Sequence, residues 1–286
     1  MHISIGGFQK NTLIDFPGVV ASLVFTQGCN FRCPYCHNPG LIPFYPFQID
    51  SHQEIDSPQA NPNGNIAKEK YNLTVKLIDP NEIFDFLKKR TGLIDGVAIS
   101  GGEPTLQPGL ESFCFRLKNM GLKVKVDTNG SHPAVVENLI KRKLVDFIAM
   151  DIKSNRAGYQ YLLKSDQYSL PITRSSKLEL KRVKPIKFDF SPILRSIKLI
   201  MKRAPAYEFR TTCIRPFVSQ EIVAEIGKMI KGASHYVLQH CSKNVQMLNP
   251  DFFQKQNPYP DPFFSDPEID QLQRIVQTHV QRCSIR

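Results

Sequence analysis

The sequence predicts an α/β protein in which helices and strands alternate around a parallel sheet. Two observations predict it: short apolar runs alternate with longer stretches of helical periodicity, and glycine or proline punctuates the stretches between them. The chain has 286 residues, of which 41% are hydrophobic and 22% charged, so it can bury a sizeable core. We therefore expect one domain over residues 1–286, with its core at about 15–245.

Each expected strand is a short apolar run followed by polar or turn-forming residues. In chain order the expected strands are Val19–Phe25, Val97–Ser100, Leu122–Asp127, Phe147–Asp151, Tyr207–Cys213 and Tyr236–His240.

The expected helices carry start and stop signals. Pro80 can open the first helix, whose apolar residues keep helical spacing and whose basic end suits the helix dipole. Gly121 and Gly232 are helix-stop signals that follow two later segments. The expected helices are Asn81–Arg90, Leu110–Met120, Pro133–Lys143, Ser219–Lys231 and Asp266–Gln281.

Three segments interrupt this rhythm. Residues 48–70 are polar and rich in turn signals, and residues 164–187 are basic with little periodicity. We interpret both as insertions in one domain. Residues 248–286 form a C-terminal extension, whose Phe- and Pro-rich part is expected to pack irregularly over the barrel before the last helix.

Bulk properties limit the class of protein. No apolar run is long enough to cross a bilayer, and the N-terminus lacks the pattern of a secretory signal. Seven cysteines, four of them scattered singly, argue against a disulfide framework and predict a reducing, cytoplasmic location. The net charge of +11 lies largely in local basic runs without a nucleic-acid-binding motif, so we expect no specific nucleic acid partner.

The most informative motif is the cysteine run Cys29-x₃-Cys33-x₂-Cys36. Three thiolates can face one inorganic centre, but structural zinc and ordinary iron–sulfur clusters take four protein ligands. A four-iron cluster held by three cysteines therefore keeps one iron open to another ligand. Two alternatives remain, a zinc knuckle completed by His37 and a redox-labile trio without metal.

Polar groups follow three of the expected strands. Gly101-Gly102-Glu103 can bring a ligand close to the backbone and offer a carboxylate to an ammonium, or it can form a plain turn. Asp127-Thr128-Asn129 and Asp151-x-Lys153 stand where barrel enzymes place their sites, although an Asx turn and a structural ion pair are alternatives.

The later strands add weaker candidates. Arg210 can bind a carboxylate in bidentate fashion or form a surface ion pair. Gln239 and His240 end the last expected strand, where a packed or capping histidine is an equal alternative for His240.

The cysteine spacing, with Tyr35 just before the third cysteine, resembles the radical S-adenosylmethionine (SAM) superfamily, as does the Gly-Gly-Glu motif. The resemblance implies a partial (β/α)₆ barrel of the TIM type. It also implies a 4Fe–4S cluster on Cys29, Cys33 and Cys36, whose open iron binds SAM and whose electron yields a 5′-deoxyadenosyl radical.

The same resemblance assigns roles to the other candidates. Tyr35 would lie over the adenine, and Lys153 would contact cofactor or substrate. A monovalent cation would lie near Asp127, Thr128, Met150 and Asp151. The remaining residues expected to bind the cofactor are Gly101, Gly102, Glu103, Asn129, Arg210, Gln239 and His240.

The stretch Gly6 to Gly18, with Cys36-His-Asn-Pro39 and the later motifs, resembles the anaerobic ribonucleoside-triphosphate reductase activating proteins. This implies an oxidoreductase that forms a glycyl radical on a partner reductase, with a flavodoxin or ferredoxin as electron donor. Three alternatives stay open: another glycyl-radical enzyme as partner, a small-molecule enzyme similar to 7-carboxy-7-deazaguanine synthases, and a metal-binding protein that keeps only the fold.

Overall fold

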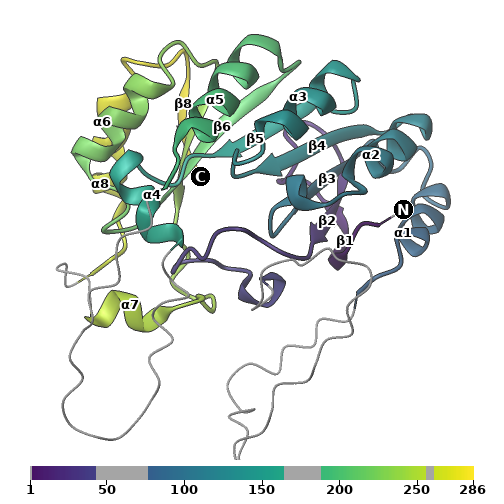
Figure 1. Cartoon of the computed structure of the whole chain (residues 1–286), viewed down its shortest axis with the longest axis horizontal. Helices are drawn as coiled ribbons and strands as arrows, with labels where there is room; N and C mark the ends of the chain where they lie inside the picture. The colour runs from purple at the N-terminus through teal and green to yellow at the C-terminus, as the bar shows by residue number, and fades with distance from the viewer. Residues whose placement is uncertain (1, 43–76, 164–187, 256–260) are drawn as a thin grey trace, which may run out of the picture.

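The computed structural model describes residues 2–42, 77–163, 188–255 and 261–286 (Figure 1). Its eight strands form one sheet in the order β1-β2-β3-β4-β5-β6-β7-β8. All neighbours from β2 to β8 are parallel, and β1 is antiparallel to β2. The order is linear, with β1 and β8 at the edges, so the sheet is not closed and the expected partial barrel is confirmed. The expected insertions at 48–70 and 164–187 lie outside the described residues.

The six expected strands are present, three of them residue for residue. They are β2 (Ala21–Thr26), β3 (Gly96–Gly101), β4 (Lys123–Thr128), β5 (Phe147–Asp151), β6 (Tyr207–Cys213) and β7 (Tyr236–His240). The sequence analysis missed β1 (Ile5–Thr12) and β8 (Cys283–Ile285). β1 is a partly exposed edge strand with two glycines, and β8 has three residues, so neither gives a clear apolar pattern.

The five expected helices are also present, as α1 (Pro80–Lys88), α2 (Leu110–Asn119), α3 (Pro133–Lys141), α6 (Gln220–Met229) and α8 (Asp266–Val276). Three helices were missed: α4 (Arg156–Leu163), α5 (Ser191–Arg203) and α7 (Pro250–Lys255). The segment expected to pack irregularly therefore contains a short helix. Two 3₁₀ turns, at Pro39–Leu41 and Pro104–Leu106, follow β2 and β3.

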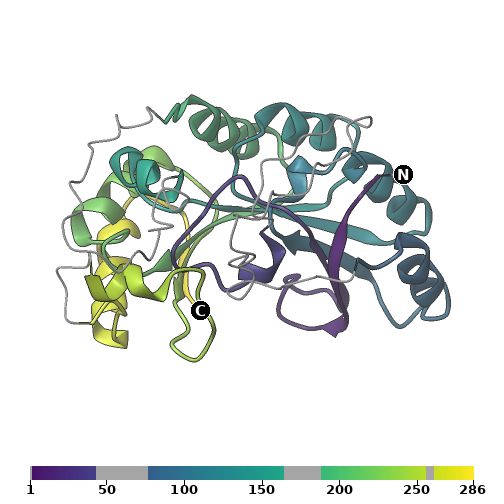
Figure 2. The same ribbon diagram turned by 60° about the horizontal axis from the view of Figure 1, so that its bottom comes forward.

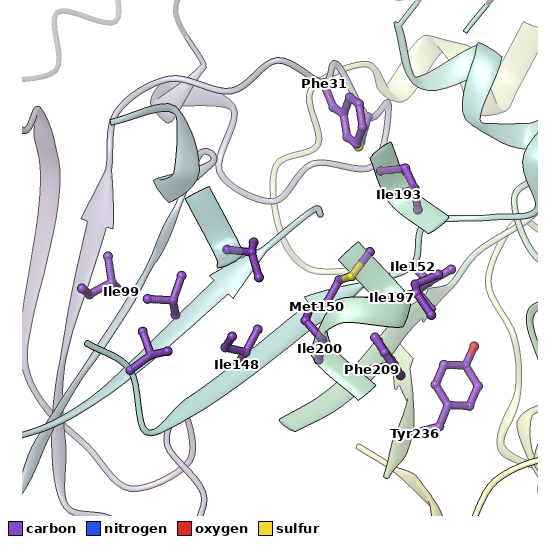
Figure 3. Packing of buried hydrophobic residues seen from close by; sticks show 14 of the residues in the cluster. Phe31, Ile99, Ile148, Met150, Ile152, Ile193, Ile197, Ile200, Phe209 and Tyr236 are labelled. Atoms are coloured by element: carbon purple, nitrogen blue, oxygen red, sulfur yellow. The ribbon is translucent and has the colours of Figure 1, made fainter. Parts of the chain in front are cut away.

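The sheet separates an apolar layer from a polar one. Because side chains alternate along a strand, Ile148 and Met150 of β5 face one side and Asp151 faces the other. Figure 3 shows Ile148 and Met150 beside Ile197 and Ile200 of α5 on the apolar side. The side chain of Met150 thus belongs to the helix-covered core.

The segment after β2 runs along the opposite side of the sheet from α2, α3 and α5 (Figure 2). The side of the sheet that carries Asp151 is therefore the side that can hold a site. Among the described helices, none has both the length and the hydrophobicity that crossing a membrane requires.

Candidate active site

A cavity at the carboxyl ends of the parallel strands brings most of the expected site residues together. It is lined by the segment after β2, by the ends of β3, β4, β5 and β6, and by the turns that follow them. The lining residues are Cys29, Phe31, Cys33, Tyr35, Cys36, His37, Asn38, Ile42, Ser100, Gly101, Gly102, Glu103, Asp127, Thr128, Asn129, Asp151, Lys153 and Thr212.

Polar contacts within the loop, with the turn after β4 and with the C-terminal extension hold the cysteine-bearing loop in place. Arg32 Nη1 donates to the carbonyl of Cys29 (2.6 Å) inside the loop. Asn129 Nδ2 donates to Asn30 Oδ1 (2.9 Å), which ties the loop to the end of β4. The backbone N–H of Leu248 donates to the carbonyl of Cys36 (3.2 Å), so the C-terminal extension also supports the loop.

The three thiols of this loop lie in a poorly solvated environment. Burial raises the pKa of Cys29 to about 12 and raises the pKa values of Cys33 and Cys36 above the ordinary thiol value. Thiolates there need a cationic centre, as a bound metal cluster provides. Among the described side chains no three Cys, His, Asp or Glu groups converge on a single ion.

The Gly-Gly pair is required by the neighbouring backbone. Gly101 has φ of +111°, and a Cβ there would lie 2.4 Å from the backbone nitrogen of Thr26. A Cβ on Gly102 would lie 1.9 Å from the carbonyl oxygen of Gly28. The sequence analysis attributed the two glycines to close approach of a ligand. The structure gives a different reason, since the turn after β3 packs directly against the start of the cysteine loop.

Glu103 is buried and saturated with donors. Its Oε1 accepts from Thr128 Oγ1 (2.6 Å) and from both the N–H (3.1 Å) and the hydroxyl (2.5 Å) of Thr105. Its Oε2 accepts from the backbone N–H of Asn129 (2.6 Å). Burial raises the pKa of Glu103 above its ordinary value, although these hydrogen bonds oppose the rise. Glu103 therefore joins the turn after β3 to the turn after β4. Thr105 was not a candidate in the sequence analysis.

The ends of β4, β5 and β6 carry five charged side chains in a row, which we call the ionic string: Lys125, Asp127, Arg210, Asp151 and Lys153. Arg210 Nε donates to Asp151 Oδ1 (2.7 Å), and its Nη1 donates to Asp127 Oδ2 (3.3 Å). Lys153 Nζ donates to Asp151 Oδ2 (2.9 Å), and Lys125 Nζ forms an ion pair with Asp127 Oδ1. Asp151 and Lys153 therefore form the ion pair that one alternative predicted, and this pair is part of the longer ionic string.

This row keeps its carboxylates ionised. Burial alone would raise the pKa of Asp127, but the charges of Arg210 and Lys125 lower it below the ordinary value. The pKa of Asp151 is also lowered, because Arg210 and Lys153 outweigh its burial. Asp151 in turn raises the pKa of Lys153 against the effect of burial. Asp127, Asp151 and Lys153 are therefore charged at neutral pH.

Lys125 is a member that the sequence analysis missed. The alternation Lys-Val-Lys-Val-Asp along β4 was a usable signal, because Lys125 and Asp127 must share a face. An exposed lysine is the usual expectation on a strand, yet the side chain of Lys125 is only 2% exposed.

Three candidates do not line the cavity. The side chain of His240 is 38% exposed, and its Nε2 lies 3.5 Å from Asp266 Oδ1 at the start of α8. Gln239 lies beside Thr212 in the register of β6 and β7, but only Thr212 lines the cavity. Arg210 also stays behind the lining and reaches it through Asp127 and Asp151.

The sequence matches the Radical SAM superfamily over residues 23–205. The chain belongs to this superfamily. It is 30% identical to a protein of Methanocaldococcus jannaschii named as a candidate glycyl-radical enzyme activating enzyme, over 100% of this chain and 97% of that one. Over 52% of each chain it is 32% identical to the pyruvate formate-lyase-activating enzyme of Clostridium pasteurianum. The chain is therefore a radical SAM protein of the glycyl-radical enzyme activating family, and this membership makes it an oxidoreductase.

A solved structure with bound S-adenosylmethionine has a similar fold. SuiB of Streptococcus suis bound to S-adenosylmethionine is 11% identical, with a TM-score of 0.53 that covers 91% of this chain and 48% of that chain. At this identity the similarity concerns the fold alone.

The superfamily uses a 4Fe–4S cluster and SAM, and the cavity fits both. Three soft thiol ligands on one loop suit an iron–sulfur cluster with an open position. Tyr35 lines the same cavity, and its hydroxyl is buried and has no hydrogen-bond partner among the described residues. A buried unpartnered hydroxyl indicates that another polar group belongs beside it.

The predicted monovalent cation fits less well. Each carboxylate oxygen of Asp127 and Asp151 already faces a lysine or arginine nitrogen. The side chain of Met150 faces the helix layer. The two carboxylates expected to bind the cation are thus engaged with the protein's own cationic side chains.

Proposed function

We propose that this chain forms a glycyl radical on a partner anaerobic ribonucleoside-triphosphate reductase. One observation carries the proposal: three cysteines and the charged side chains of Asp127, Asp151 and Lys153 line one cavity at the mouth of a radical SAM barrel. The similarity to a candidate activating enzyme over the full length of this chain supports it. The motif from Gly6 to Gly18 favours the ribonucleotide reductase among the possible partners.

The proposal gives the residues of the cavity separate tasks. Cys29, Cys33 and Cys36 hold the cluster, and Arg32 and Asn129 keep their loop in place. When bound, the reduced cluster and SAM supply a 5′-deoxyadenosyl radical, which removes a hydrogen atom from a glycine Cα.

The remaining residues orient SAM and exclude water. Gly101, Gly102 and Glu103 form the rigid turn beside its methionine group, and the ionic string offers positive charge to its carboxylate. Tyr35 lines the cavity and packs against Phe217, with ring centroids 5.2 Å apart. The electron donor we propose is a flavodoxin or ferredoxin, and the cytoplasmic location remains a prediction.

The test uses the reconstituted, reduced protein with SAM and the candidate reductase under anaerobic conditions. Electron spin resonance is expected to show a glycyl doublet on the reductase, and methionine and 5′-deoxyadenosine are expected in the solution. Matched controls are Cys33→Ala in this chain and replacement of the radical-bearing glycine by alanine in the reductase.

The two products separate the possible failures. SAM cleavage without a doublet on the reductase would contradict this partner but leave the chemistry intact. Absence of cleavage by a cluster-loaded protein would contradict the proposed function itself.

A further inference from the structure

Lys125 is the end of the ionic string that lies deepest in the barrel. Lys125 stands on β4 opposite Ala98 of β3 and Phe147 of β5, neither of which is charged. Its side chain is 2% exposed, and its Nζ forms an ion pair with Asp127. A buried ammonium is costly without a charged partner, so the position of Lys125 is fixed by Asp127.

The charges of the ionic string do not cancel. Lys125, Arg210 and Lys153 bring three positive charges, and Asp127 and Asp151 bring two negative ones, which leaves one positive charge beside the cavity. Without Lys125 the remaining four side chains would be neutral together. A bound sodium or potassium ion would then be needed to restore the same positive charge.

We propose that Lys125 takes the place of a monovalent cation in this chain, so that SAM binding does not depend on sodium or potassium. The ammonium is held at Asp127, which itself lines the cavity, so Lys125 offsets the negative charge of a lining carboxylate. Lys125 does not line the cavity itself and is a positioning residue. This inference rests on the proposed SAM chemistry.

The test measures the dissociation constant of SAM for the cluster-loaded protein by equilibrium dialysis, with potassium chloride or N-methylglucamine chloride at equal ionic strength. The wild-type constant is expected to differ by less than about twofold between the salts. For Lys125→Met we expect binding at least about tenfold weaker in N-methylglucamine chloride and largely restored by potassium. The matched control is Lys123→Met, an exposed lysine on the same strand, which should bind SAM as the wild type does in both salts.

A second readout is the change that SAM causes in the electron spin resonance spectrum of the reduced cluster, which should follow the same salt dependence. A wild-type protein whose binding tightens severalfold with potassium overturns the proposal, even if Lys125→Met does not fold. A folded Lys125→Met protein whose weak binding potassium does not restore also overturns it. If no protein binds SAM in either salt, the proposed function has failed, and the inference fails with it.

Discussion

The cysteine loop and the ionic string face the same cavity but are prepared for it differently. Burial raises the pKa values of the three thiols, so the loop favours neutral groups until a metal centre stabilises thiolates. In the ionic string each carboxylate already has its cations, and the pKa values of Asp127 and Asp151 are lowered. The charge of the cysteine loop therefore depends on bound iron, whereas the charge of the ionic string is built into the fold.

The largest expected effect is loss of the cluster. Cys29→Ala, Cys33→Ala and Cys36→Ala should each reduce SAM cleavage below detection, since no other thiol lines the cavity among the described residues. Iron content and 5′-deoxyadenosine release measure this. The control is Cys114→Ala, which removes a buried thiol of α2 that does not line the cavity and should keep both. A cavity-cysteine variant with wild-type turnover would remove that residue from the ligand set.

The next largest effect is expected from a mutation that breaks the ionic string. Arg210→Met removes the cation shared by Asp127 and Asp151 and should lower the free energy of unfolding by roughly 3–5 kcal/mol. Urea unfolding of the metal-free protein measures it, with Arg203→Met, which breaks an exposed ion pair with Glu137, as control. A loss below about 1 kcal/mol would show that the string is not coupled to folding.

The pH dependence of that loss has a definite sign. The folded pKa values of both carboxylates lie below the ordinary value of 3.8, so their stabilisation is complete above pH 3.8 and is lost as the pH falls through the folded values. The deficit of Arg210→Met should therefore stay constant from about pH 7 to pH 5 and shrink in acid below pH 3.8.

A smaller effect tests how the two halves are joined. Gly102→Ala places a Cβ against the carbonyl of Gly28 and should cost about 1–3 kcal/mol and reduce iron incorporation, because the cysteine loop must shift. The control is Gly121→Ala. Gly121 has a left-handed φ of +79°, which strains any other residue, but a Cβ there would meet nothing within 4 Å. Equal iron contents in the two variants would contradict the role of this packing.

The smallest effect is expected at His240. His240→Ala should change SAM cleavage by less than about twofold, because the side chain contacts Asp266 and does not line the cavity. A loss of tenfold or more would show that the strand-end residue reaches the cofactor in a state that this structure does not contain.

Much of this could be predicted from the sequence. The six inner parallel strands were predicted within a few residues, because their helix-covered faces are apolar even where, as in β4, the other face carries charges. The edge strand β1 carries exposed polar residues and two glycines, so its pattern is weak. The helix α5 was visible in principle from Ile193, Ile197 and Ile200, but it follows a basic segment that we interpreted as an insertion.

The candidate site shows the same limit. Cys29, Cys33 and Cys36 are close in sequence, so their spacing predicted that they bind one metal cluster. The partners of Asp127 come from two strands, and Arg210 meets it only because β4, β5 and β6 lie side by side. Residue spacing cannot show which of several charges pair across a sheet, and it therefore cannot show that Lys125 is buried.

The most direct measurement of the central claim is SAM binding to the open iron. The chain is loaded anaerobically, its iron is counted, and the electron spin resonance spectrum of the reduced cluster is recorded with and without SAM. We expect about four irons per chain and an electron spin resonance spectrum that changes when SAM is added. Zinc in place of iron, or a cluster spectrum that SAM leaves unaltered, would contradict it.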